Sequence, residues 1–135
     1  MDWSVNYVAV LVAAVAIFML GGLWYSPLLF AKHWVALQGK SPEEMRGGAS
    51  PSLYVQVFVC GLVTAWVMGL LMRHMPEPGL HHGLLIGALL WLGFAGATSY
   101  GTALFSFKPK MLWVIDSGFN LASFLLAGAI LSIWR

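Results

Sequence analysis

The chain has 135 residues, of which 60% are hydrophobic and only 9% are charged, and its formal net charge is +2. A soluble domain has about a quarter charged residues, and a chain this short has too little interior to hide so much apolar surface from water. The composition excludes a water-soluble domain, and the small, dispersed positive charge excludes a nucleic-acid-binding footprint, so the expected partner is the lipid bilayer.

Four apolar runs predict membrane-spanning helices, at residues 5–30, 51–72, 80–105 and 109–134. Each run has at least the ~20 residues that an α-helix needs to cross the hydrocarbon core. An open sheet is excluded because lipid cannot satisfy its backbone donors and acceptors. We therefore expect an all-α membrane protein, with residues 1–135 forming a single transmembrane domain that is an antiparallel four-helix bundle.

Span one contains a proline near its end, Pro27. Proline lacks a backbone donor and clashes with the carbonyl four residues earlier, which here belongs to Leu23. We predict a kink or local unwinding that frees this carbonyl to face a polar interior. Trp3 and Trp24 are separated by about 31 Å of helix, which indicates aromatic belts at the two membrane surfaces.

The connection between spans one and two predicts a short interfacial helix. Residues 41–44 read Ser-Pro-Glu-Glu, a pattern typical of a helix start. Upstream, Phe30, Trp34 and Leu37 recur at helical spacing and predict an apolar stripe along the membrane surface. Ser50 and Pro51 then provide an N-cap and a first-turn proline for span two.

Small residues recur on two spans at intervals of four, which allows helix backbones to approach closely. Span two has the stripe Gly61, Ala65 and Gly69, and span three has Gly93, Ala97 and Gly101, with a further pair at Gly83 and Gly87. We predict that spans two and three pack on these faces. The alternative use of such a stripe is a homodimer interface, and a homo-oligomer, most simply a dimer, is the expected assembly.

The basic residues are distributed unequally between the two predicted sides of the membrane. One side holds Lys32, Lys40, Arg46, Lys108 and Lys110, and the other holds Arg73 and Arg135. The positive-inside rule makes the first side cytoplasmic. Both termini are then expected outside.

One ionisable residue lies well inside a predicted span, namely Asp116, with Asn120 one turn further on the same face. A charge inside a span is by default a functional candidate. The functional interpretation is a cytoplasm-facing polar cavity lined by Trp24, Tyr25, Ser26, Ser99, Asp116 and Asn120. The structural interpretation is a packed hydrogen-bond cluster that holds the helices in register, with Asp116 also near enough to the interface to reach water or Lys110.

Other reactive groups give weaker signals. His74, His81 and His82 flank the predicted turn between spans two and three, but their spacing matches no zinc pattern, so no metal site and no cofactor are expected. Cys60 lies in an apolar run and is interpreted as a packing residue. The sequence has no phosphate-binding loop, nucleophile elbow or paired carboxylates, and we expect no catalytic residues and no enzyme activity.

Three segments resemble a family of small, mainly bacterial four-span proteins catalogued as domain of unknown function 1761. They are Asn-Tyr-Val-Ala-Val at residues 6–10, Gly-Leu-Trp-Tyr-Ser-Pro at 22–27 with Phe30 and Trp34 following, and Val-Ile-Asp-Ser-Gly-Phe at 114–119. The resemblance covers nearly the whole chain and implies an integral protein of a bacterial inner membrane. It brings no established activity, substrate or catalytic residue.

Two hypotheses of function follow. The leading hypothesis is a homo-oligomeric bundle that binds or passes a small solute or ion through its polar half, with Asp116 as the charged element. The alternative is a non-transporting membrane scaffold or accessory subunit, in which Asp116 holds the bundle together.

Overall fold

Helices account for most of the chain in the computed structural model, which describes residues 2–39, 41, 43, 44, 48, 50–77 and 79–135. The elements are α1 (Tyr7–Trp24), α2 (Ala31–Leu37), α4 (Pro51–Arg73), α5 (Leu80–Leu90), the π-helical segment η1 (Trp91–Gly96), α6 (Ala97–Ser106) and α7 (Lys110–Ile133). The predicted all-α bundle is confirmed, as is the short helix between the first two spans.

Four stretches of the described residues are long and apolar enough to cross a membrane: Tyr7–Trp24, Pro51–Arg73, Leu80–Ser106 and Lys110–Ile133. Two of them begin at side-chain caps. The Asn6 carboxamide accepts a hydrogen bond from the Ala9 backbone N–H (3.1 Å), and the Ser50 hydroxyl accepts one from Leu53 (3.2 Å). The chain is an integral membrane protein with lipid around the outer faces of these helices.

Span one is shorter than its apolar run, because α1 ends at Trp24 and not near Phe30. Pro27 lies in the turn that follows, so it terminates the helix and does not kink it. The Leu23 carbonyl accepts hydrogen bonds from the Ser26 backbone N–H (3.2 Å) and hydroxyl (2.7 Å). The prediction that Pro27 leaves this carbonyl free for a polar interior is therefore wrong.

The predicted interfacial helix forms earlier than the Ser41 motif suggested. It is α2, at Ala31–Leu37, directly after the turn that Pro27 begins. The Ser41 hydroxyl accepts from the Glu44 backbone N–H (3.2 Å), as a helix start would require. The other residues of that start include Pro42 and residues 45–47, which lie outside the described part of the chain.

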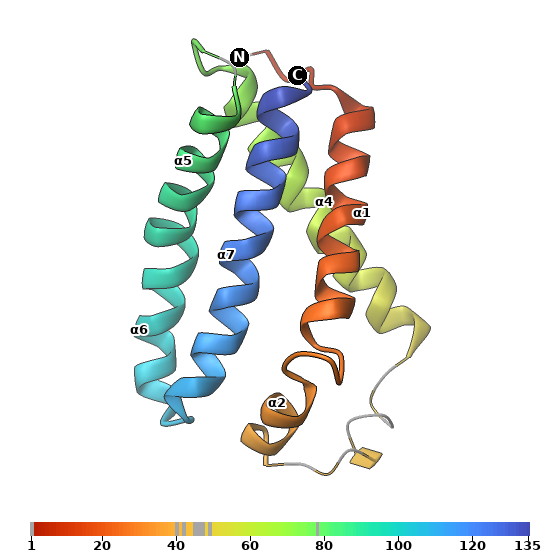
Figure 1. Cartoon of the computed structure of the whole chain (residues 1–135), viewed down its shortest axis with the longest axis vertical. Coiled ribbons are helices and arrows are strands. Elements are labelled where there is room, and N and C mark those ends of the chain that lie inside the picture. The colour runs from red at the N-terminus through yellow and green to blue at the C-terminus, as the bar shows by residue number, and fades with distance from the viewer. Residues whose placement is uncertain (1, 40, 42, 45–47, 49, 78) are drawn as a thin grey trace.

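Helix α7 is the centre of the bundle, with α1 on one side, α5 and α6 on the other, and α4 behind (Figure 1). Both termini lie at one end, here called the terminal end, together with the turn that follows Arg73. Helix α2 and the turn between α6 and α7 lie at the opposite end, called the loop end. The four spans therefore alternate in direction, as an antiparallel bundle does.

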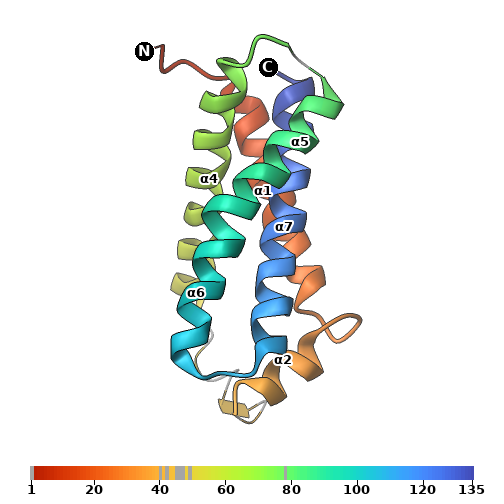
Figure 2. The same cartoon turned by 90° about the vertical axis from the view of Figure 1, so that its left-hand side faces the viewer.

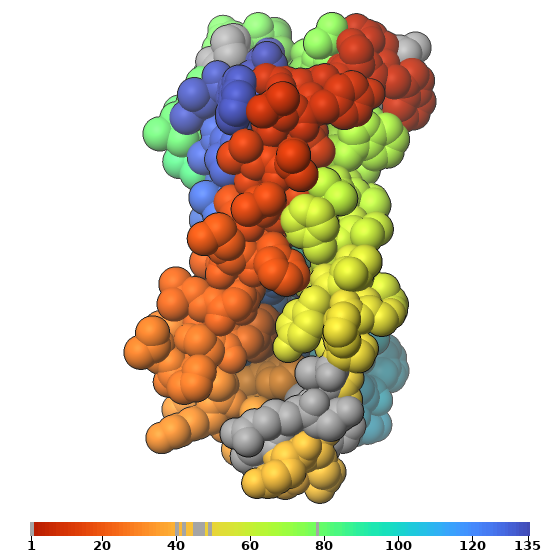
Figure 3. All heavy atoms as spheres, turned by 90° about the vertical axis from the view of Figure 1, so that its right-hand side faces the viewer, coloured from red at the N-terminus to blue at the C-terminus, as the bar shows by residue number. Residues whose placement is uncertain are grey.

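The buried core is made largely of alanines that let α1, α4 and α7 approach closely. Ala9, Ala13, Ala14, Ala65 and Ala127 have no exposed surface. Gly69 extends this contact, since a Cβ there would lie 3.4 Å from the Val10 side chain and 3.7 Å from Leu131. The space-filling view shows α1 and α4 lying side by side (Figure 3).

The prediction that spans two and three pack on their small-residue faces is wrong. The Gly61–Ala65–Gly69 stripe of α4 faces α1 and α7, and the elements of span three pack chiefly on α7. The physical reason is that α1 carries its own run of alanines, so it offers α4 a close partner. A short turn between two helices does not force them to pack together.

Helices α5 and α7 make the closest backbone contact. A Cβ at Gly83 would overlap the Gly128 carbonyl oxygen, and one at Gly87 would lie 2.6 Å from the Phe124 carbonyl oxygen. Only glycine fits at these two positions. The pair Gly83 and Gly87 thus forms a helix-packing seam, but its partner is α7.

The second predicted stripe faces outward. A Cβ at Gly93 or Gly101 would meet no atom within 4 Å, and Ala97 is exposed. The loop-end half of α4 is also exposed, since among residues 51–60 only Phe58 is partly covered. Cys60 is exposed as well, so its interpretation as a buried packing residue is wrong. The bundle is therefore tightly packed at its terminal end and open at its loop end, where α4 diverges from α7 (Figure 1).

Candidate functional site

The Asp116 carboxylate is held by two donors from distant parts of the chain. The Tyr25 hydroxyl donates a hydrogen bond to Oδ1 over 2.6 Å, and the Trp34 indole N–H donates to the same oxygen over 2.9 Å. Tyr25 lies in the turn that Pro27 creates and Trp34 lies on α2. The ending of α1 at Trp24 is thus what brings both donors back onto α7.

Two more indoles donate to the α7 backbone on either side of Asp116. Trp24 donates to the Ile115 carbonyl (3.0 Å), and Trp91 donates to the Ser117 carbonyl (2.9 Å). Each helical carbonyl has a second lone pair for such a bond. Three consecutive residues of α7, Ile115, Asp116 and Ser117, therefore each accept a hydrogen bond from an indole N–H. The donors are Trp24, Trp34 and Trp91.

Glycines make room for two of these rings. A Cβ at Gly118 would lie 3.2 Å from the Trp24 ring, and one at Gly96 would lie 2.9 Å from Trp91. Trp91 and Gly96 are the first and last residues of η1. The wider turn of a π-helix is common at functional positions, and here it accompanies the indole that crosses from span three to α7.

Aromatic rings pack against the two residues that bind the carboxylate and against Trp24. Tyr25 makes edge-to-face contacts with Trp34 (5.3 Å between centroids) and Phe119 (5.6 Å), and Trp24 lies 5.0 Å from Phe30. Such pairs add roughly 0.5–1.5 kcal/mol each beyond area burial. Asp116 itself is half-buried, and one hydroxyl and one indole donate to it.

The six predicted site residues are only partly brought together. Trp24, Tyr25 and Asp116 meet as described. The Ser26 hydroxyl donates within its own turn, to Leu23. Ser99 lies with Trp113, whose indole donates to the Ser99 hydroxyl over 2.9 Å, while that hydroxyl donates to the Gly96 carbonyl.

The Asn120 side chain makes no hydrogen bond with another described residue, although it lies one turn from Asp116 on α7. The hydroxyls of Thr98 and Thr102 donate to carbonyls three or four residues earlier in their own helix. Such back-bonding is the usual way for a hydroxyl to sit inside an apolar helix. These side chains therefore add little to a shared polar site.

Two surface hollows of the described residues lie away from Asp116. A small one at the terminal end is lined by α1, α4 and α7. A larger one, of about 160 Å³, lies beside the turn between α6 and α7. Neither is lined by Asp116, Tyr25 or Trp34.

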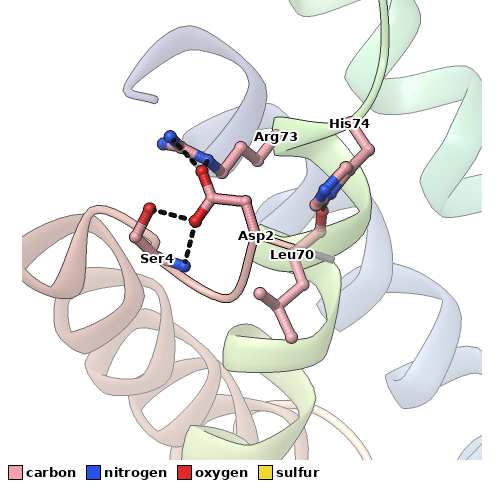
Figure 4. A network of polar contacts seen from close by, with 5 residues as sticks. All are labelled: Asp2, Ser4, Leu70, Arg73 and His74. Carbon is pink, nitrogen blue, oxygen red and sulfur yellow. Dashed lines mark hydrogen bonds and ion pairs between the residues drawn. The ribbon is translucent and has the colours of Figure 1, made fainter.

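A second polar network lies at the terminal end (Figure 4). Arg73 forms an ion pair with Asp2 (2.8 Å), and the backbone N–H and hydroxyl of Ser4 both donate to the other Asp2 oxygen. These hydrogen bonds, first from Ser4 and then from Arg73, lower the pKa of Asp2 to about 2. The network fastens the N-terminal segment to the end of α4.

The histidines remain scattered. His74 Nδ1 lies 2.8 Å from the Leu70 carbonyl oxygen, and His82 lies 3.3 Å from Glu77. In the described part of the chain, no three side chains of the metal-binding types His, Cys, Asp or Glu gather as a metal ion would need.

Sequence reasoning missed Trp34 and Trp91 as site residues. The spacing of Trp34 with Phe30 and Leu37 predicts a stripe along the membrane surface, whereas the turn at Pro27 brings its indole back to Asp116 on α7. Trp91 gave no signal in the sequence, because an indole inside an apolar run is equally compatible with lipid.

Comparison with known proteins gives one match. A family model described as "Protein of unknown function (DUF1761)" matches residues 8–132, nearly the whole chain. No curated protein and no solved structure matches.

Proposed function

The chain therefore belongs to the DUF1761 family, and from that premise we propose that it is a non-transporting membrane scaffold or accessory subunit. The observation that carries the proposal is the double occupation of Asp116 Oδ1 by Tyr25 and Trp34. These two hydrogen bonds link Asp116 to side chains that lie 91 and 82 positions earlier in the sequence. A carboxylate placed in this way stabilises the bundle.

The rival function, passage of a solute or ion, has less support. A conducting site must exchange partners and must open into a cavity, whereas the two hollows described above lie away from Asp116. Aromatic rings pack against Tyr25, and they bring no oxygen ligand of the kind that would replace the water molecules around a small ion. The balance of these features favours a structural Asp116.

The first test separates the two roles of Asp116. Asp116→Ala leaves the Tyr25 and Trp34 donors unpaired, and we expect it to lower the free energy of unfolding in detergent by about 1–3 kcal/mol. Asp116→Asn keeps an acceptor oxygen and should lose less. Asn120→Ala, on the same face without a described partner, is the matched control and should change stability by under about 0.5 kcal/mol.

The same variants are then assayed for proton flux in proteoliposomes that contain a pH-sensitive dye. We expect wild-type vesicles to acidify no faster than protein-free vesicles. The scaffold function is wrong if wild-type vesicles pass protons and the folded Asp116→Asn variant does not. The structural role is wrong if Asp116→Ala and Asn120→Ala unfold alike.

The outward stripe Gly93, Ala97 and Gly101 supports a homodimer as the form that the scaffold takes. Inside the chain, glycines bring backbones together where α5 meets α7. Further along span three, by contrast, a Cβ at Gly93 or Gly101 would meet no atom within 4 Å. Span three is also the least buried of the four spans. A second copy packed through this stripe would give it the close backbone partner that small residues permit.

Mass measurement in detergent tests this assembly. We expect a dimer for the wild type and a monomer for Gly93→Ile or Gly101→Ile, because a branched side chain separates the two backbones. Val63→Ile, at an exposed position on α4 and away from the stripe, should stay dimeric. A wild-type monomer in both detergent and vesicles would contradict the proposal.

A further inference from the structure

The hollow beside the turn between α6 and α7 combines positive charge with aromatic walls. It measures about 160 Å³ and is lined by Tyr100, Ala103, Leu104, Phe107, Lys108, Lys110 and Trp113. One water needs roughly 10–15 Å³ of such space, so a polyatomic group fits. The hollow lies beside the turn that joins α6 and α7 at the loop end, and Figure 2 shows the course of that turn.

The electrostatics of the hollow favour an anion. Its lining residues include two lysines, Lys108 and Lys110, and no carboxylate. Lys110 also begins α7, and the first turn of a helix carries partial positive charge. The carboxylate of the same helix, Asp116, accepts bonds from Tyr25 and Trp34.

The aromatic walls are fixed in place. Trp113 donates its indole N–H to Ser99 (2.9 Å), so the ring acts as a wall and its donor is already used. Tyr100 packs edge-on against Trp113 at 4.8 Å between centroids. Contacts between α6 and α7 therefore hold the shape of the pocket, and the lysines supply its hydrogen-bond donors.

The turn itself exposes apolar side chains next to the lysines. Phe107 adopts a left-handed conformation (φ 56°) that ends α6, and its side chain is 91% exposed. Phe105 is 85% exposed. Exposed apolar rings beside lysines at the end of two spans allow the rings to contact acyl chains while the lysine ammonium groups reach the headgroups.

We propose that this hollow binds the phosphate-bearing headgroup of an anionic phospholipid, with Lys108 and Lys110 pairing with the phosphate. Leu104 and Phe107 would contact the start of its acyl chains. The site is independent of the scaffold function, since Asp116, Tyr25 and Trp34 are not among its lining residues.

Native mass spectrometry of the purified full chain tests the site, with phosphatidylglycerol and phosphatidylcholine supplied as competing lipids. We expect the wild type to retain phosphatidylglycerol preferentially. Lys108→Gln and Lys110→Gln should each lower that preference about fivefold, the effect expected for one cationic side chain near an anionic membrane surface. Lys32→Gln removes the same charge from α2, at the same end of the bundle, and should leave the preference unchanged.

A second variant separates a built pocket from general surface charge. Ala103→Phe keeps both lysines but fills the hollow, and we expect it to abolish the preference while the helical circular dichroism is retained. Unchanged preference in Ala103→Phe, or an equal loss in Lys32→Gln, would overturn the proposal. Displacement of the lipid by millimolar inorganic phosphate, with phosphate then bound in its place, would assign the site to free phosphate and would also overturn it.

Discussion

The two aspartates of the chain show how position decides what a carboxylate does. Asp116 lies inside a span and accepts hydrogen bonds from an aromatic hydroxyl and an indole. Asp2 is exposed at the terminal end and accepts from Ser4 and Arg73. Its contacts are screened by water, so they direct the N-terminal segment without adding much stability to the bundle.

The Asp2 network predicts a titration at unusually low pH. Its folded-state pKa of about 2 lies below the ordinary value of 3.8. The contacts are therefore fully present above about pH 4 and are lost as the pH falls through 2. In ¹³C NMR of the Asp116→Asn variant, where Asp2 is the one remaining aspartate, we expect its carboxyl signal to titrate near 2.

Arg73→Gln should move that midpoint toward 3.8, because it removes the ion pair while the Ser4 bonds remain. Arg135→Gln is the matched control, since Arg135 donates instead to the carbonyl oxygens of Met75 and Glu77. A midpoint near 3.8 in the parent protein would mean that the Asp2 contacts do not form in solution.

At the same scale, the sequence predicted the centre of the candidate site but not its full set of donors. An acid inside a span must find partners in hydrocarbon surroundings, so Asp116 was predictable. Which groups reach it depends on where α1 ends. We expect Ser26 and Ser99 at the site, yet each hydroxyl donates to a carbonyl three residues earlier in its own segment, which a serine side chain reaches without help from another helix.

At the scale of elements, hydropathy predicted the spans well because helices in lipid must satisfy their own backbone. The predictions of spans two to four differ from the helices by at most one residue at each end. Span one differs most, because the apolar run continues past Trp24 whereas helix α1 ends there. Residues 25–30, mostly apolar, belong to a turn whose backbone N–H groups donate to the carbonyls of Gly21, Leu23, Trp24 and Ser26.

The pairing of helices could not be predicted from stripes of small residues. Such a stripe allows close approach but does not identify the partner. The alanines of α1 at positions 9, 13 and 14 are completely buried, and they compete with span three for the glycines of α4. Gly128, which faces Gly83 across the α5–α7 contact, became recognisable as a packing residue only with both helices in place.

At the scale of the whole molecule, both the burial of side chains and the kind of charged contacts change along the axis from the terminal end to the loop end. The terminal end holds the buried alanines of the core, and Arg73 and Arg135, which contact neighbouring residues. The loop end holds the diverging half of α4, the lysines of α2 and the α6–α7 turn, and the hollow between α6 and α7. The two ends therefore present different surfaces to the two sides of a membrane.

The orientation of this axis is the last prediction. Five of the seven basic residues, among them Lys40 and Arg46 outside the described part of the chain, belong to the loop side by sequence, and the positive-inside rule makes that side cytoplasmic. In a Cys60→Ser background, Glu77→Cys should react with a membrane-impermeant maleimide in intact cells, while Lys108→Cys should react only after the cells are permeabilised. Both residues are exposed and lie in turns at opposite ends, so their intrinsic access is comparable. The reverse pattern would place the termini inside, and equal labelling of both would indicate insertion in two orientations, which the charge bias opposes.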